Sequence, residues 1–70
     1  MATRFEVFID TQNKWRFRLK ARNGEIIASS EAYESKQGCL KGVKSIKRNA
    51  LLAPTIFIDL SEEPTIVDLL

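Results

Sequence analysis

The chain has 70 residues, so it has room for one domain and lies near the lower size limit for a self-sufficient core. Natural chains of this size tend to add a disulfide, a metal or a partner subunit. Cys39 is the only cysteine and there is no histidine, which excludes an intrachain disulfide and argues against a conventional zinc site. We therefore expect no metal and no cofactor, and oligomerisation remains as the stabilising device.

No stretch approaches the roughly 20 apolar residues that span a bilayer. The first residues also lack the apolar run of a signal peptide. A single cysteine is compatible with a reducing compartment. These features predict a cytoplasmic protein that does not associate with membranes.

The net charge of +2 conceals an asymmetry along the chain. Residues 1–50 contain all eleven Lys and Arg and five of the nine acids, for a net charge of +6. Residues 51–70 contain the other four acids and no base, for a net charge of −4. A basic body with an acidic tail can bind polyanions, or the tail can cover a basic surface of its own or a neighbouring subunit.

Two segments alternate apolar and polar residues with a period of two, which is typical of half-buried antiparallel strands. They begin at Phe5 and at Trp15. A two-residue loop between them would mix the two faces. A three-residue loop sets Val7 opposite Phe17, and its third residue is Asn13, which tolerates a left-handed backbone.

The dipeptide Asn23-Gly24 follows the second strand and predicts a two-residue type I′ hairpin turn. That turn would set Arg22 opposite Glu25 and Arg16 opposite Glu31. It would also place Ile26 and Ala28 on the face that carries Phe17 and Leu19.

Residues 35–49 change to a helical period, with lysines largely on one side and an apolar stripe on the other, formed by Cys39, Leu40, Val43, Ile46 and Ala50. Ser35 is the expected N-cap. Gly38 and Gly42 would allow the helix to approach the sheet closely, around Trp15 and Phe17. Pro54 ends the helical region, and apolar runs follow at 55–60 and 65–70.

The predicted fold class is therefore α+β: a three-stranded antiparallel sheet packed on one helix (β-β-β-α), with a C-terminal extension that forms an additional strand. Residues 1–50 form the domain. Residues 51–70 form the extension, which we expect to take part in self-association.

The residues that support this reading also resemble a known family. Arg-Phe-Arg-Leu-Lys at 16–20 and Ser-Ile-Lys-Arg-Asn-Ala at 45–50 are the most specific segments, and the resemblance covers residues 4–50. The chain resembles the YegP-like family of small uncharacterised bacterial proteins. The resemblance implies a β-β-β-α unit, found as tandem copies or as a single copy that pairs with itself, and it implies no activity. Ala32 and Asn13 stand where the family commonly has glycine.

No constellation for catalysis is present, so we expect no catalytic residue and a protein that is not an enzyme. Cys39 lacks a histidine to activate it and lies on the apolar stripe of the helix, which favours a buried structural role. The serines likewise lack a base.

Two interaction surfaces remain, and they define the two leading functional hypotheses. The first is a self-associating structural or interaction module, a homodimer whose other protein partners are unknown, because this chain carries more apolar surface than a lone small domain exposes. Its candidate interface residues are Phe8, Ile27, Ile56, Phe57, Ile58 and Leu60. The alternative is weak, sequence-independent binding of nucleic acid or another polyanion. Its candidate residues are Arg16, Arg18, Lys41, Lys44 and Lys47.

Overall fold

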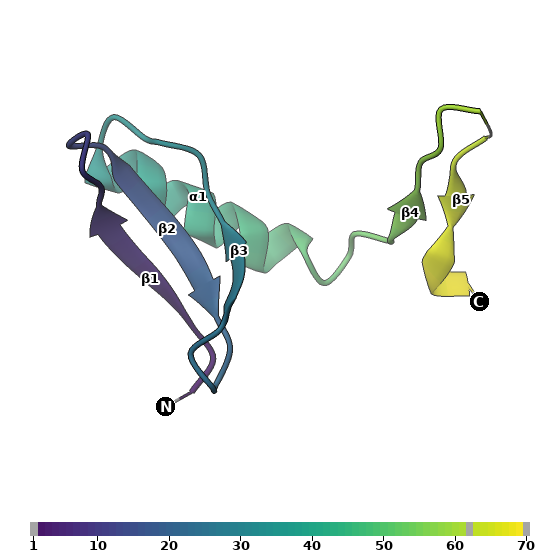
Figure 1. The fold of residues 1–70 in the computed structure, drawn as a ribbon, viewed down its shortest axis with the longest axis horizontal. Helices are drawn as coiled ribbons and strands as arrows, with labels where there is room; N and C mark the ends of the chain where they lie inside the picture. The colour runs from purple at the N-terminus through teal and green to yellow at the C-terminus, as the bar shows by residue number, and fades with distance from the viewer. Residues whose placement is uncertain (1, 62, 70) are drawn as a thin grey trace.

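The computed structural model describes residues 2–61 and 63–69. A three-stranded antiparallel sheet, in the order β1-β2-β3, carries helix α1 on one face, and a two-stranded hairpin follows (Figure 1). This arrangement confirms the predicted α+β fold. The elements are β1 Arg4–Ile9, β2 Trp15–Lys20, β3 Ile26–Ser29, α1 Lys36–Asn49, β4 Ile56–Phe57, β5 Thr65–Ile66 and the 3-10 helix η1 Val67–Leu69.

The hairpin of β1 and β2 has the predicted register. Val7 lies opposite Phe17, and the three-residue loop closes with a hydrogen bond of 2.8 Å from the Asp10 N–H to the Lys14 carbonyl. Asn13 has a φ of 63°, as the left-handed third position of such a loop requires. The apolar side chains of both strands therefore share one face.

The turn between β2 and β3 differs from the prediction. The Ala21 N–H donates to the Glu25 carbonyl at 2.9 Å, so the loop has three residues, and Gly24 alone takes a positive φ of 90°. Arg22 therefore does not lie opposite Glu25. The third position of a three-residue loop has a left-handed backbone, which glycine adopts readily. The Asn23-Gly24 dipeptide was therefore compatible with a three-residue loop as well as with a two-residue type I′ turn.

A β-bulge in β3 then restores the predicted register between β2 and β3. Lys20 lies opposite Ile26 and Leu19 opposite Ala28, so Ile27 is the extra residue. The prediction for Ala28 is confirmed. The prediction for Ile26 is wrong, because Ile26 shares the outer face with Lys20 and is 55% exposed.

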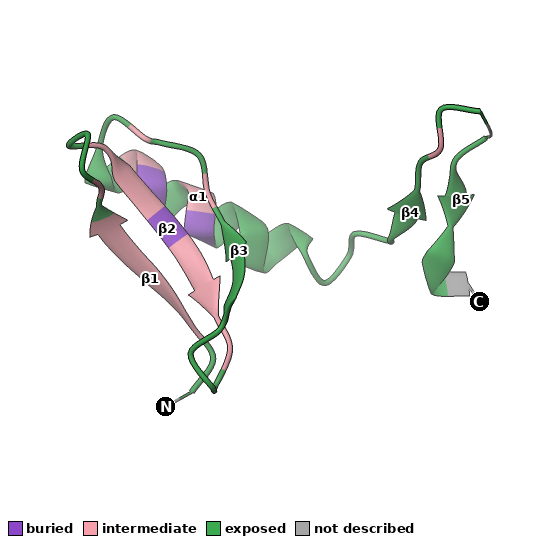
Figure 2. Cartoon of the chain, in the orientation of Figure 1, coloured by how far each residue is buried: buried purple, intermediate pink, exposed green. Residues whose placement is uncertain are grey.

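The core is small and lies between β2 and α1 (Figure 2). Its buried side chains are Phe17, Cys39 and Val43, and the half-buried side chains of Phe5, Val7, Trp15 and Tyr33 pack against them. Burial raises the pKa of the Cys39 thiol, as expected for a structural cysteine. The helix begins as predicted, because the Ser35 hydroxyl accepts a hydrogen bond of 3.0 Å from the Gly38 N–H.

The close approach at Gly42 involves Tyr33, which lies outside the alternating and helical patterns of the sequence. A methyl group at Gly42 would lie 2.9 Å from Cζ of Tyr33 and 3.2 Å from Cε2 of Phe17. Tyr33 reaches this position because two backbone hydrogen bonds, of 3.0 and 2.7 Å, tie it to Trp15 along the edge of β2. Gly42 thus makes room for Tyr33 and Phe17, where we had expected Trp15 and Phe17.

The C-terminal extension forms a hairpin of its own, made of β4, β5 and η1, and does not add a strand to the main sheet. We call these three elements, together with the loop that joins β4 to β5, the C-terminal hairpin. It stands clear of the body (Figure 1). The radius of gyration is 15.0 Å, against about 11 Å for a compact domain of this length. Leu70, the last residue of the predicted apolar run, lies outside the described residues.

Candidate interaction site

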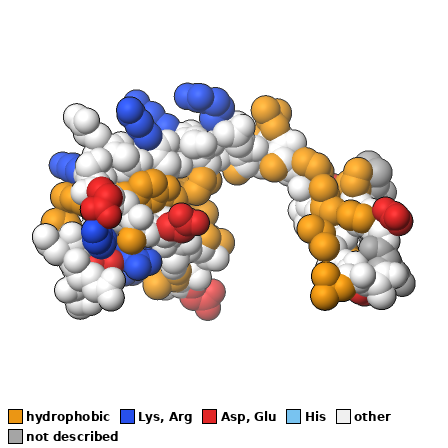
Figure 3. Space-filling view, turned by 90° about the horizontal axis from the view of Figure 1, so that it is seen from above, with side chains coloured by type: hydrophobic (Ala, Val, Ile, Leu, Met, Phe, Trp, Pro, Cys, Tyr) orange, Lys and Arg blue, Asp and Glu red, His pale blue; other side chains and the backbone are white. Residues whose placement is uncertain are grey.

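Exposed apolar side chains concentrate on the C-terminal hairpin. The exposed fraction is 56% for Phe57 and 72% for Ile58, and Leu60 is fully exposed. Ile56 completes the predicted set on this element, and the structure adds Ile66 and Val67. The apolar run after Pro64 was the signal for these two residues. In the space-filling view, orange side chains cover much of this part of the chain (Figure 3).

The hairpin is a formed element with its own hydrogen bonds. Ile56 lies opposite Ile66, and the Val67 N–H donates to the Thr55 carbonyl at 2.7 Å. The Asp68 carboxylate accepts from the Thr55 N–H at 2.8 Å. At the other end Asp59 accepts from the backbone N–H and the hydroxyl of Ser61, which lower the pKa of its carboxyl. Two strands alone are marginally stable in water, so this hairpin is an element in need of a packing surface.

The other two predicted interface residues lie elsewhere. Phe8 is half-buried, because the guanidinium of Arg18 lies 4.6 Å from the centre of its ring. Ile27 is 58% exposed at the bulge of β3. The structure therefore gathers four of the six predicted interface residues on the C-terminal hairpin and leaves Phe8 half-buried and Ile27 exposed on the body.

The arginines of the sheet are paired with carboxylates. Arg18 bonds to Glu6 at 2.8 Å, and Arg16 bonds to Asp10. The hydrogen bond from Arg18 is the largest cause that lowers the pKa of Glu6, and the bond from Arg16 does the same for Asp10. The predicted Arg16–Glu31 pair is replaced by Arg16–Asp10. Two of the five candidate polyanion residues therefore already have anionic partners.

The helix lysines differ from these arginines in that they have no ion-pair partner among the described residues. Lys41 and Lys44 are exposed, and neither makes an ion pair with a described acidic residue. Lys47 also lacks such a pair, and its ammonium group lies 5.7 Å from the centre of the Phe5 ring. Basic side chains line the outer side of the molecule over α1 (Figure 3). Of the five candidate residues, only the three lysines of the helix thus lack an acidic partner among the described residues.

Two further features are absent from residues 2–61 and 63–69, the part of the chain that the structure describes. These residues contain no group of three or more Cys, Asp or Glu side chains placed to hold a metal ion. No helix in the same part of the chain is long and apolar enough to cross a membrane.

Comparison with known proteins identifies the family of this chain. Residues 10–56 match the family model described as a domain of unknown function, DUF1508. The chain belongs to this family. A UPF0339 protein of Treponema denticola is 62% identical over 50 residues, which cover 71% of this chain and 86% of that protein. A UPF0339 protein of Methanosarcina acetivorans is 51% identical over 57 residues, 81% of this chain and 98% of that protein.

Two further relatives connect the family to a name and to a solved fold. The UPF0339 protein YegP of Escherichia coli is 46% identical over 50 residues, which cover 71% of this chain and 46% of YegP. The NMR solution structure of a protein from Haloferax volcanii is 45% identical, with a TM-score of 0.76 over 81% of this chain and 97% of that one. The chain is thus a YegP-like protein, and none of these names describes an activity. The family model ends at Ile56, so most of the C-terminal hairpin lies outside the DUF1508 pattern.

Proposed function

We propose that this YegP-like protein is a cytoplasmic self-associating interaction module that forms a homodimer through residues 54–70. The observation that carries the proposal is the C-terminal hairpin, a formed element whose apolar side chains are exposed and stand clear of the body. Large exposed apolar patches on small proteins mark interaction sites. The free, buried thiol of Cys39 suits the reducing cytoplasm.

The small size of the buried core also supports self-association. The buried core of the described residues has three side chains, which is little for a domain of this length. The 50 residues aligned with YegP cover only 46% of YegP, so that protein has room for a second unit in the same chain. A chain with a single unit gains the same burial by pairing with a second copy.

Molar mass in solution tests this proposal. Replacing Ile56 and Phe57 by aspartate in the full chain puts charge on both faces of β4, so we expect a dimeric wild type and a monomeric I56D/F57D variant. Circular dichroism should show the β-β-β-α fold in both. A variant that dimerises as tightly as the wild type would place the interface outside β4.

A second candidate function is weak binding of single-stranded nucleic acid or another polyanion through α1. The favouring observation is the set of helix lysines without described acidic partners, which contrasts with the paired Arg16 and Arg18. Lys41, Lys44 and Arg48 are spaced i, i+3 and i+7, so they lie along one side of the helix. Phosphates along a strand could contact this row by displacing counterions.

Fluorescence anisotropy with a labelled oligonucleotide tests this candidate. Affinity should fall steeply from low to physiological salt, and the K41Q/K44Q variant should bind more weakly than the wild type. The control variant K14Q/K20Q removes two lysines that are paired with Glu34 and Glu6, and should bind like the wild type. Failure of the wild type to bind at low salt would eliminate this candidate.

A further inference from the structure

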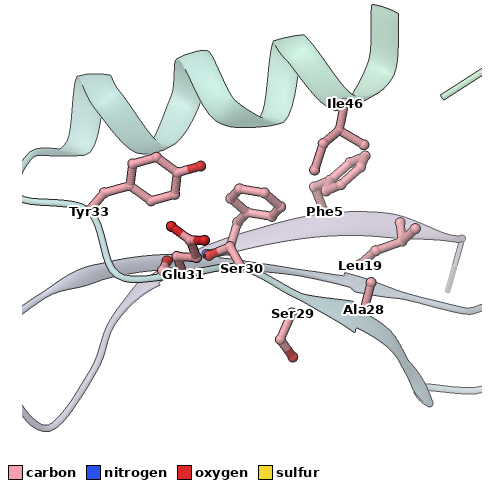
Figure 4. A pocket seen from close by; sticks show the side chains of 9 residues that line it. Phe5, Leu19, Ala28, Ser29, Ser30, Glu31, Tyr33 and Ile46 are labelled. Carbon is pink, nitrogen blue, oxygen red and sulfur yellow. Dashed lines mark hydrogen bonds between the residues drawn. The ribbon is translucent and has the colours of Figure 1, made fainter. Parts of the chain in front are cut away.

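A groove lies between α1 and β3. It forms because α1 packs on β1 and β2 and leaves β3 without cover, so that all four residues of β3 are exposed. The groove has a volume of about 380 Å³. Ile46 reaches down from the helix toward Phe5, with Leu19 and Ala28 on the sheet below (Figure 4). Its other end is more polar, with Ser30 and Glu31.

The C-terminal hairpin has the properties of an occupant for this groove. Ile56 and Ile66 are cross-strand partners, so they lie on one face, with exposed fractions of 47% and 42%. Their backbone positions are already fixed by the hydrogen bonds at Thr55. Docking in the groove would bury this exposed pair and give the two-stranded hairpin the packing surface that it lacks.

Charge favours the same pairing. The tail from residue 51 onward carries net charge −4, and the body carries +6, so any tail is attracted to any body. The ammonium group of Lys47 lies over Phe5, which lines the groove, so a cation is present beside the apolar surface. An apolar element with acidic neighbours thus meets the apolar end of the groove, which has Lys47 beside it, and not the end that carries Glu31.

The path of the chain directs the hairpin away from its own groove. After α1, the N–H groups of Leu52 and Ala53 both donate to the Asn49 carbonyl at 3.0 Å, and Pro54 follows directly. This turn projects the hairpin beyond the helix end (Figure 1). Docking in the same chain would require the connection to break this turn and reverse over the helix. A second copy related by a twofold axis can receive the hairpin with the turn intact.

We propose that the groove between α1 and β3 is the docking site for the C-terminal hairpin of a second copy, exchanged reciprocally. The inference rests on the homodimer proposed above and adds to it the surface that receives the hairpin. Each copy then contributes one hairpin and one groove, and the two contacts are identical.

Mixing two variants of the full chain tests this arrangement. Ala28→Glu places a carboxylate in the groove and leaves the hairpin intact, whereas I56D/F57D disables the hairpin and leaves the groove intact. Each variant alone should have a dimer dissociation constant raised by at least about tenfold. An equimolar mixture should form a 1:1 heterodimer, because one intact hairpin then meets one intact groove. Native mass spectrometry distinguishes the heterodimer from both homodimers by mass.

The possible results separate this inference from the homodimer itself. If Ala28→Glu and a second groove variant, Ile46→Glu, are folded by circular dichroism and dimerise like the wild type, the groove is not the docking site and the homodimer stands. If the folded variants do not form a heterodimer when mixed, reciprocal exchange is overturned. If the wild type is monomeric, both proposals fail together.

Discussion

The phenol ring of Tyr33 lies over the backbone of Gly42, with its hydroxyl closest to the place that a methyl group at Gly42 would occupy. Helix α1 can approach Phe17 and Tyr33 only because position 42 has no side chain. Substituting alanine there adds about 1 kcal/mol of helix propensity but overpacks the core, which typically costs about 1–3 kcal/mol.

We therefore expect Gly42→Ala to lower the free energy of unfolding by about 1 kcal/mol. Gly38→Ala is the matched control, because its methyl group would meet Ser35 Oγ at 3.2 Å and Tyr33 Cδ1 at 3.7 Å, and it should leave stability unchanged or raise it. Tyr33→Phe removes the closest atom, so Gly42→Ala should cost less in that background. Urea denaturation of the wild type, the two alanine variants, Tyr33→Phe and the Tyr33→Phe/Gly42→Ala double variant measures these differences. Equal effects of the two alanines would contradict the packing described at Gly42.

The N-cap of α1 gives a second prediction. Ser35→Ala removes the acceptor for the Gly38 N–H and should reduce the free energy of unfolding by about 1 kcal/mol. Ser35→Asp restores an acceptor and adds a negative charge at the helix N-terminus, so it should retain the wild-type stability. Thermal unfolding followed at 222 nm compares the three proteins; loss of stability in Ser35→Asp as large as in Ser35→Ala would argue against the cap.

The third prediction concerns the stability of the folded protein at low pH. The ion pairs of Glu6 and Asp10 lower the pKa of both carboxyls below their ordinary values of 4.5 and 3.8. A depressed pKa in the folded state contributes stability that is present above the ordinary value and is lost as pH falls through the folded value. The protein should therefore lose stability as pH decreases below about 4.5. Glu6→Gln should flatten this dependence, as measured by urea midpoints between pH 2 and 6. A variant with the wild-type acid dependence would mean that Glu6 contributes nothing to it.

Most of the body could be predicted from the sequence because its signals agreed with one another. The alternation in β1 and β2 permits only one loop length that keeps Val7 and Phe17 on one face, and the structure has that loop. Ser35 and two residues of the apolar stripe, Cys39 and Val43, likewise predicted the start and the buried side of α1. Leu40 and Ile46 of the same stripe are exposed, because the small sheet covers them only in part.

The errors occurred where two conformations suit the same residues. Asn23-Gly24 fits a two-residue or a three-residue loop, and the consecutive isoleucines at 26 and 27 leave the register of β3 open, so the bulge could not be foreseen. The packing of Tyr33 on Gly42 depends on the path of the chain after β3, which carries no periodic signal. For the candidate site, the apolar tail was evident, whereas the cover over Phe8 and the pairing of Arg16 with Asp10 depend on side-chain geometry.

The molar mass of the full chain by light scattering, measured from micromolar to hundreds of micromolar concentration, tests the central claim most directly. The account predicts a mass that rises to twice the chain mass of 8.0 kDa, and a mass that stays at 8.0 kDa for the I56D/F57D variant over the same range. A wild-type mass of 8.0 kDa at hundreds of micromolar would contradict the proposal that the C-terminal hairpin assembles a homodimer.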